Sequence, residues 1–125
     1  MSWDIVLFNS RQTITSADEI DPTQLEATDF DSVLQAHFKQ IENKENHREI
    51  IGEDYSIDYF IDAEHVSNKL LNLYGEKGLY ELILLARKHN WQIYDSGLGE
   101  MLDINNPSKN GYDSFQNYLR KVLKQ

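Results

Sequence analysis

The sequence contains no cysteine in its 125 residues. This absence excludes disulfide bonds, cysteine-ligated zinc and catalysis by a thiol, and it fits a reducing compartment such as the cytoplasm. No apolar run in the sequence approaches the ~18 residues of a membrane-spanning helix. Asp4 stands where a secretory signal would carry basic residues. We therefore expect an unexported, cytoplasmic protein with no membrane segment.

Basic residues are also few. The 12 Lys and Arg residues oppose 21 Asp and Glu residues, so the formal net charge is −9. The basic residues are scattered, apart from a small C-terminal group that suits the end of a helix. An acidic domain repels phosphate groups and anionic membranes and attracts basic proteins. We therefore expect no nucleic-acid or membrane partner and favour a basic protein as the partner.

Motifs that carry phosphate binding, metal binding or nucleophilic catalysis are missing. The sequence has no GxxxxGK[ST], GxGxxG or GxSxG pattern, and its four histidines show no HExxH or other recognisable metal spacing. Asp95, Glu100 and Asp103 follow a predicted strand, and such a cluster could hold Mg²⁺ or serve as acid and base. A solvated acidic surface explains these three residues more simply. We predict no cofactor and no metal site.

The composition is that of a folded protein. Hydrophobic residues make up 40% of the chain and aromatic residues 11%, which is enough apolar surface to offset the entropy of ordering the chain. A length of 125 residues fits one domain. We predict a single domain over residues 1–125.

Alternating or short apolar stretches predict the strands. The clearest covers residues 55–62, where Tyr55, Ile57 and Tyr59 alternate with polar neighbours such as Asp58. Further strands are predicted at residues 3–8 and 91–95, and shorter stretches at 48–52 and 101–104 are compatible with strands.

Apolar residues at helical spacing predict three helices. The first covers residues 30–41, with Asp29 or Asp31 as its N-cap. The second covers residues 76–90 and has basic residues in its last turn, where they suit the helix dipole. The third covers residues 112–123.

Two connections lie outside these elements. Residues 42–47 are predicted to form a charged connector, and residues 11–29 a long acidic loop that could include a short helix. Loops of that length inside a compact domain are often functional.

Residues 66–74 fit either a helix or a strand. With a strand there, the main elements follow the order strand, helix, strand, strand, helix, strand, which is the ferredoxin-like βαββαβ order, and a C-terminal helix is added. With a helix there, the fold stays α+β but that topology fails. We favour the strand and predict an α+β fold with a mainly antiparallel sheet, helices on one face and the other face open.

The acidic residues concentrate in two places, the loop at residues 11–29 and the predicted hairpin at residues 53–64. Aromatic residues lie among the second group, and acidic residues around aromatic anchors are typical of a surface that binds a basic protein. An ordinary solvated acidic surface, with the aromatic residues pointing inward, explains the same pattern. The predicted partner-binding residues are Asp18, Glu19, Asp21, Glu53, Asp54, Asp58, Phe60, Asp62 and Glu64.

Several stretches resemble small bacterial immunity proteins, the antitoxins encoded beside polymorphic or contact-dependent inhibition toxins. The matching stretches are WDIVLFN (residues 3–9), LYGE (73–76), LYEL (79–82), WQIYD (91–95) and NPSKNGY (106–112). They include both ends of the chain, and the acidic middle matches least. The resemblance implies a protein that binds a toxin domain in the cytoplasm and occludes its active site. Many such toxins are basic nucleases, whose substrate charge an acidic inhibitor mimics.

The leading hypothesis is therefore a cytoplasmic immunity protein that neutralises a cognate, basic toxin domain by direct binding. One alternative is a small carboxylate- or Mg²⁺-dependent enzyme built around Asp95, Glu100 and Asp103. Another is a non-inhibitory interaction module that self-associates through an open sheet face or a strand edge. The sequence leaves the oligomeric state open.

Overall fold

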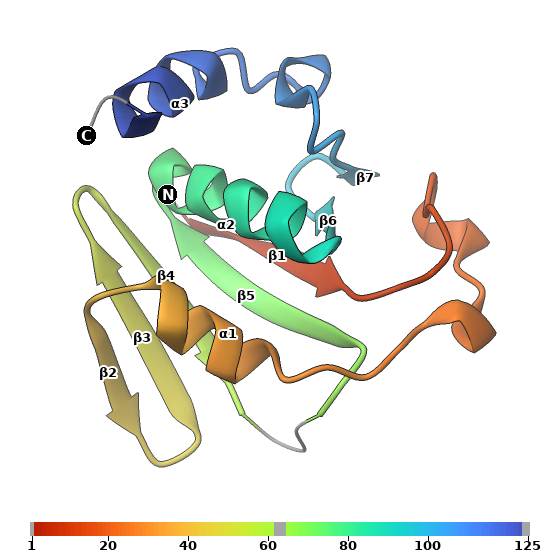
Figure 1. The fold of residues 1–125 in the computed structure, drawn as a ribbon, viewed down its shortest axis with the longest axis horizontal. Helices are drawn as coiled ribbons and strands as arrows, with labels where there is room; N and C mark the ends of the chain where they lie inside the picture. Colours follow the sequence, from red (N-terminus) through yellow and green to blue (C-terminus); the bar gives the residue numbers. More distant parts are fainter. Residues whose placement is uncertain (1, 62–64, 124–125) are drawn as a thin grey trace.

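The computed structural model of the protein describes residues 2–61 and 65–123 (Figure 1). In these residues three α-helices and seven strands form an α+β fold, and the strands make one antiparallel sheet in the order β2-β3-β4-β5-β1-β6-β7. The strands are β1 (Ser2–Phe8), β2 (Ile41–Lys44), β3 (His47–Gly52), β4 (Tyr55–Phe60), β5 (Asn68–Tyr74), β6 (Gln92–Asp95) and β7 (Glu100–Met101). The helices are α1 (Phe30–His37), α2 (Glu76–His89) and α3 (Phe115–Leu123), with short 3₁₀ helices η1 (Ala17–Glu19), η2 (Pro22–Gln24) and η3 (Pro107–Asn110). The predicted α+β class and antiparallel sheet are confirmed.

The four central strands have the split βαβ arrangement. Along the chain they occur as β1-α1-β4-β5-α2-β6, and in the sheet they lie in the order β4-β5-β1-β6. The β2–β3 hairpin is inserted between α1 and β4 and extends one edge, while β7 extends the other. This is the ferredoxin-like order with added edge strands.

The ambiguous stretch at residues 66–74 contains strand β5, so the favoured alternative is confirmed. Leu71 and Leu73 are buried, whereas Leu70 and Tyr74 are exposed, which is the period of two expected of a strand with one buried face. Strand β5 pairs along its whole length with β1, from Ser2 opposite Tyr74 onward, and also with β4.

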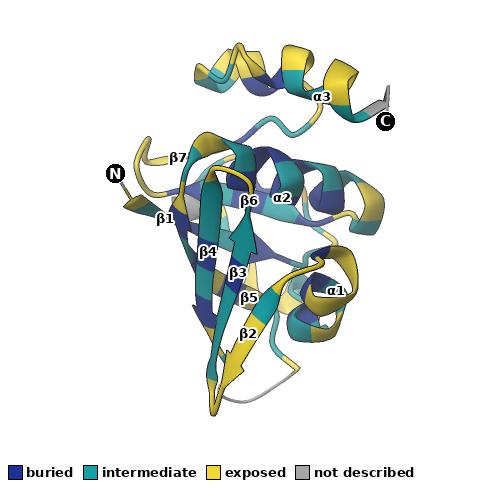
Figure 2. Cartoon of the chain, turned by 90° about the vertical axis from the view of Figure 1, so that its left-hand side faces the viewer, coloured by how far each residue is buried: buried dark blue, intermediate teal, exposed yellow. Residues whose placement is uncertain are grey.

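Helices α1 and α2 cover one face of the sheet, and their inward sides carry the buried residues (Figure 2). Phe30 of α1 packs on Trp91, with ring centroids 4.8 Å apart. The hydroxyl of Tyr59 in β4 donates a hydrogen bond of 2.8 Å to the Asp31 carboxylate of α1. Helix α3 lies on α2 instead of on the sheet (Figure 1), and its Phe115 ring is 5.5 Å from Tyr80.

Two predicted helix boundaries were wrong, and the short strand expected at residues 101–104 is instead β7, Glu100–Met101. The first helix ends at His37 instead of continuing to residue 41, because Phe38 takes an extended backbone and Ile41 pairs with Ile50 in strand β2. The predicted connector at residues 42–47 is therefore most of β2, a tight turn and the start of β3. The last helix begins at Phe115 instead of residue 112, because η3 precedes it.

The predicted long acidic loop is present and is tied to the sheet. It contains η1 and η2, and backbone bridges join Ser10 to Leu25 and Thr28 to Val66. The side chain of Gln92 in β6 accepts a hydrogen bond of 2.7 Å from the Ile14 amide. The loop therefore lies at the end of the sheet where β1 finishes and β6 begins. Within residues 2–61 and 65–123, no helix has the length and apolar character needed to cross a membrane.

Candidate protein-binding face of the sheet

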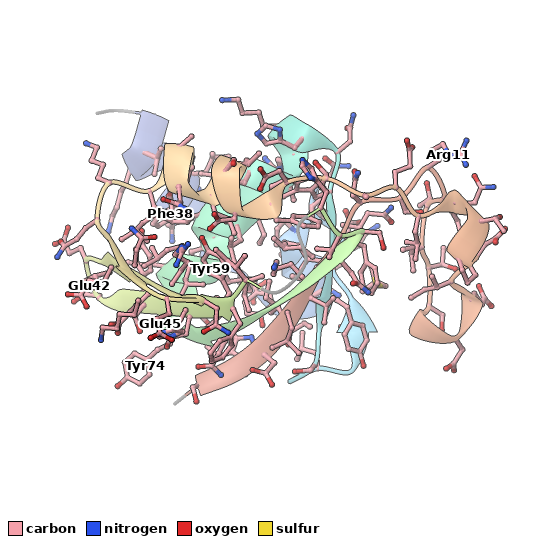
Figure 3. All side chains as sticks on the ribbon, turned by 90° about the horizontal axis from the view of Figure 1, so that it is seen from below. Arg11, Phe38, Glu42, Glu45, Tyr59 and Tyr74 are labelled. Carbon is pink, nitrogen blue, oxygen red and sulfur yellow. The ribbon has the colours of Figure 1, made fainter. Side chains whose placement is uncertain are left out.

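The sheet face opposite α1 and α2 is the open face. In Figure 3, Tyr74 points away from α1 on this side, whereas Phe38 and Tyr59 lie on the side of the helix. Strand alternation assigns the other residues of the open face through the register of each ladder. Two neighbouring rows of side chains, which run across the strands, define its chemistry.

The acidic row consists of Glu42, Glu49, Asp58 and Asp4, with Asn72 between the last two. In the ladders Glu42 is opposite Glu49, Glu49 is opposite Asp58, Asp58 is opposite Asn72, and Asn72 is opposite Asp4. The row thus crosses β2, β3, β4, β5 and β1. With neighbouring strands ~4.8 Å apart, it extends over about 19 Å.

The apolar row runs beside the acidic row, two residues further along each strand. It consists of Phe60, Leu70, Val6, Tyr94 and Met101. The ladders place Val6 opposite both Leu70 and Tyr94. The β4–β5 ladder ends at Asp58 and Asn72, and Phe60 lies two residues beyond that end in β4. Phe60 is 58% exposed and Leu70 56%, and Tyr74, on the other side of the acidic row, is 56% exposed.

This arrangement costs stability. Like charges directly opposite each other on neighbouring strands repel, and Glu42, Glu49 and Asp58 form two such pairs. Only part of the repulsion is relieved locally. His47 Nε2 lies 3.2 Å from Asp58 Oδ1, and Lys44 Nζ lies 3.9 Å from Glu42 Oε2. The Asn72 amide donates a hydrogen bond of 2.9 Å to Asp4. Within the apolar row Phe60 and Leu70 are exposed, and Val6, Tyr94 and Met101 are half-buried. Exposed apolar side chains next to such a charge row are characteristic of an interaction surface.

The structure divides the predicted partner-binding residues among separate places. Asp58 and Phe60 lie on the open face. Glu53 and Asp54 form the β3–β4 turn, where Lys77 of α2 binds the Asp54 carboxylate at 3.1 Å. The residues Asp18, Glu19 and Asp21 lie in and beside η1 and η2, and Asp62 and Glu64 lie outside the described residues.

The β3–β4 turn and the acidic loop stand at opposite ends of the strands. The turn contacts Gly75, just after the end of β5 that pairs with the start of β1. The loop instead follows the end of β1. These two acidic groups therefore do not form one surface.

Sequence reasoning missed most of the open face. Glu42, Glu49, Asp4, Val6 and Leu70 were not predicted as site residues, because their alignment depends on strand order and register. The available signal was the alternation within β4 and β5, which identifies outward-pointing positions but not their neighbours.

A second feature is a groove between α3, the N-terminal half of α2 and the β3–β4 turn, lined by residues that include Tyr55 and Glu53. Glu81 also lines this groove, and its carboxylate accepts hydrogen bonds from His37 Nε2 at 2.9 Å and from the Tyr118 hydroxyl. The bond from His37 holds the pKa of Glu81 below its ordinary value against the opposing effect of burial, and the bond from Tyr118 adds to it. These contacts join α1, α2 and α3, so we assign them a structural role.

The carboxylates of the alternative enzyme hypothesis each have local hydrogen bonds. Asp95 accepts the amides of Gly97 and Leu98, and Glu100 accepts the Asn110 side chain. Asp103 accepts the amides of the two residues at positions 105 and 106. The bonds of Asp95 shape the β6–β7 turn, and those of Glu100 and Asp103 shape the chain around η3. In the described part of the chain, no group of three or more His, Asp or Glu side chains is placed to hold a metal ion.

No protein-family model, curated protein or solved structure matches this chain significantly.

Proposed function

We propose that this protein is an immunity protein that binds a cognate, basic toxin domain in the cytoplasm through the open face and thereby occludes the toxin's active site. The observation that supports the proposal most is the acidic row beside the exposed side chains of the apolar row. The resemblance of the sequence to immunity proteins supplies the inhibitory role, and the net charge of −9 supports a basic partner.

The two rows supply different parts of the binding reaction. The carboxylates attract a basic surface from a distance and so raise the association rate, which falls when salt screens them. Phe60, Leu70 and Tyr94 lose water only on contact, so they slow dissociation. A toxin whose active site binds a polyanion presents the complementary charges, and binding here would exclude its substrate.

The test is co-expression with the protein encoded by the adjacent reading frame, followed by pull-down of the purified pair. We expect toxicity without this protein, protection with it, and a stable complex. Equal toxicity in both cultures, or a neighbour that is not toxic, would contradict the proposal.

A charge-reversal pair tests the face itself. The Glu49→Lys/Asp58→Lys variant should bind the toxin domain more slowly and with a weaker salt dependence. The matched control is Glu100→Lys/Asp113→Lys, which changes the net charge equally at exposed positions outside both rows. An unchanged association rate in the first variant would reject these two positions as contacts.

A further inference from the structure

Strand β2 is an edge of the sheet. It stands at one end of the strand order, and Figure 1 shows it on the outside of the molecule. The Ile51 amide donates a hydrogen bond of 3.0 Å to the Gln40 carbonyl, and hydrogen-bonded pairs alternate from there along the β2–β3 ladder. By this alternation the backbone N–H and C=O groups of Ile41 and Asn43 point away from β3. Such an edge is a template for pairing with another strand.

Two charges of opposite sign flank Asn43 on the open face. The side chains of Glu42 and Lys44 are 50% and 66% exposed, and within one chain Lys44 Nζ lies 3.9 Å from Glu42 Oε2. Suppose that β2 pairs antiparallel with β2 of a second copy, with Asn43 opposite itself. Each Glu42 then lies opposite the Lys44 of the other copy. Opposite charges in directly facing positions stabilise a strand pair.

We infer that this protein forms a two-fold symmetric dimer in which the β2 strands of two copies pair antiparallel, centred on Asn43. This inference goes beyond the proposed function and does not depend on it. The two Asn43 residues exchange both of their backbone hydrogen bonds, and a Glu42–Lys44 pair flanks them on each side. Each copy contributes the same residues, as in other two-fold symmetric interfaces.

The charges of β2 favour this register and oppose its neighbours. Edge strands commonly carry charged side chains that prevent pairing. A shift of the second copy by two residues in one direction would place Glu42 opposite Glu42, and a shift in the other direction would place Lys44 opposite Lys44. Like charges in facing positions destabilise a strand pair. The two side chains therefore block a general edge contact but support the contact centred on Asn43.

The pairing also continues the acidic row into basic groups of the second copy. In one copy the row begins with Glu42, Glu49 and Asp58, which lie opposite one another in turn. Across the two-fold axis Glu42 meets Lys44, and His47 lies opposite Lys44 in the next strand of that copy. The second copy therefore offsets the repulsion within the acidic row at its β2 end.

Helix α1 leaves room for the second copy. Its Asp31 carboxylate lies 3.6 Å from Arg48 of β3 and 2.8 Å from the Tyr59 hydroxyl of β4, so α1 lies over these two strands. With strands ~4.8 Å apart, α1 is about 10 Å from the two-fold axis and about 20 Å from α1 of the second copy. That separation exceeds the ~10–12 Å width of a helix. The helices of both copies lie on one side of the joined sheet, so the dimer leaves both open faces uncovered.

Sedimentation equilibrium of the full chain at concentrations up to about 1 mM tests the dimer, because so small a contact associates weakly. We expect a monomer–dimer equilibrium. Glu42→Lys and Lys44→Glu each place like charges opposite one another at two positions, so each should weaken association about tenfold or more. The double variant Glu42→Lys/Lys44→Glu restores opposite charges and should associate like the wild type. Net charge cannot produce this pattern, since the first substitution makes the chain less acidic and the second makes it more acidic.

Two further measurements locate the contact. Asn43→Pro removes the outward N–H but no β2–β3 hydrogen bond, so it should abolish association while circular dichroism shows an intact fold. In nuclear magnetic resonance spectra of the ¹⁵N-labelled wild type, the amides of residues 41–44 should shift with concentration, and those of β7, the opposite edge, should not. A chain that stays monomeric at the highest concentration, single charge variants that associate like the wild type, a double variant that does not recover, or shifts confined to positions outside β2 would each overturn the inference.

Discussion

The buried carboxylate of Asp95 holds the C-terminal segment to the sheet. It is 0% exposed and lies at the end of β6. One oxygen accepts the amides of Gly97 at 2.9 Å and Leu98 at 3.2 Å, and the other accepts the hydroxyl of Tyr112. Burial and this hydrogen bond raise the pKa of Tyr112, so its hydroxyl stays a donor. Asp95 therefore closes the β6–β7 turn and fixes the chain that leads into α3.

The Asp95→Ala substitution leaves three donors without their acceptor. A hydrogen bond to a charged group contributes about 1.5–3 kcal/mol, but the three effects overlap and the turn amides can reach water. We therefore expect the free energy of unfolding to fall by about 3–4 kcal/mol. At roughly 0.05–0.15 kcal/mol per residue, a chain of 125 residues has about 6–19 kcal/mol in total. The variant should fold but be clearly weakened.

Urea unfolding followed by the fluorescence of the two tryptophans measures this loss. Asp95→Asn is the matched control: its oxygen can still accept the turn amides, so it should lose only about 1 kcal/mol. Tyr112→Phe and the double variant complete a mutant cycle, in which we expect a coupling of about 1–2 kcal/mol. A loss of less than about 1 kcal/mol in Asp95→Ala would show that Asp95 does not hold the C-terminal segment. The same follows if the losses of Asp95→Ala and Tyr112→Phe simply add in the double variant.

Three further changes test other parts of the fold. Trp91→Ala should lower the free energy of unfolding by about 3–5 kcal/mol, because the residue is 2% exposed and packs in the core. A loss as small as that of a surface substitution would contradict the core position of Trp91. The pKa of Glu81 is lower in the folded state than in the unfolded chain, so the ionised carboxylate stabilises the fold at pH values above the unfolded-state pKa, and this stabilisation is lost as the pH falls through the folded-state pKa. Between about pH 6 and about pH 3.5 the free energy of unfolding should therefore fall more in the wild type than in Glu81→Gln. Equal losses would count against the hydrogen-bond network around Glu81. Gly75→Ala should lower the free energy of unfolding by at least ~2 kcal/mol, because φ is +93° and a Cβ would lie 2.4 Å from a backbone oxygen. Gly99→Ala should lower it less, because φ is +70° but the space around the position is open.

Much of the fold could be predicted from local patterns. The alternation through Tyr55, Ile57 and Tyr59 identified β4, and the apolar spacing of α2 located that helix to within one residue. Strand β2 was missed because the β2–β3 turn uses Glu45 at φ +46°, a position usually taken by glycine or asparagine. Without that turn signal, the charged residues around it had the composition of a connector.

The open face could be predicted only in part, because its chemistry arises from register. Asp58 and Phe60 were identified from alternation within one strand. Asp4 and Asn72 are 68 positions apart in sequence and meet only because β1 pairs with β5. No local pattern contains that pairing, since a slip of one residue would turn each strand's outward side chains inward.

Two acidic groups remain distinct candidates for the contact, and equal charge changes can separate them. Asp18 and Glu19 lie in the loop at the end of β1, where Glu19 accepts the Thr15 hydroxyl at 2.9 Å. Glu49 and Asp58 lie in the acidic row beside exposed apolar groups. All four carboxylates attract a basic partner at long range, but only the carboxylates that contact the partner are desolvated on binding.

We therefore expect Asp18→Lys/Glu19→Lys to slow association with the toxin domain less than about threefold at physiological salt, where charges beyond ~8 Å are screened. Glu49→Lys/Asp58→Lys should weaken binding about tenfold or more, because it also places cations against a basic surface. The association and dissociation rates of both variants, measured at two salt concentrations, decide between them. Equal losses would mean that the partner responds to net charge alone, and a larger loss in the first variant would assign the interface to the loop.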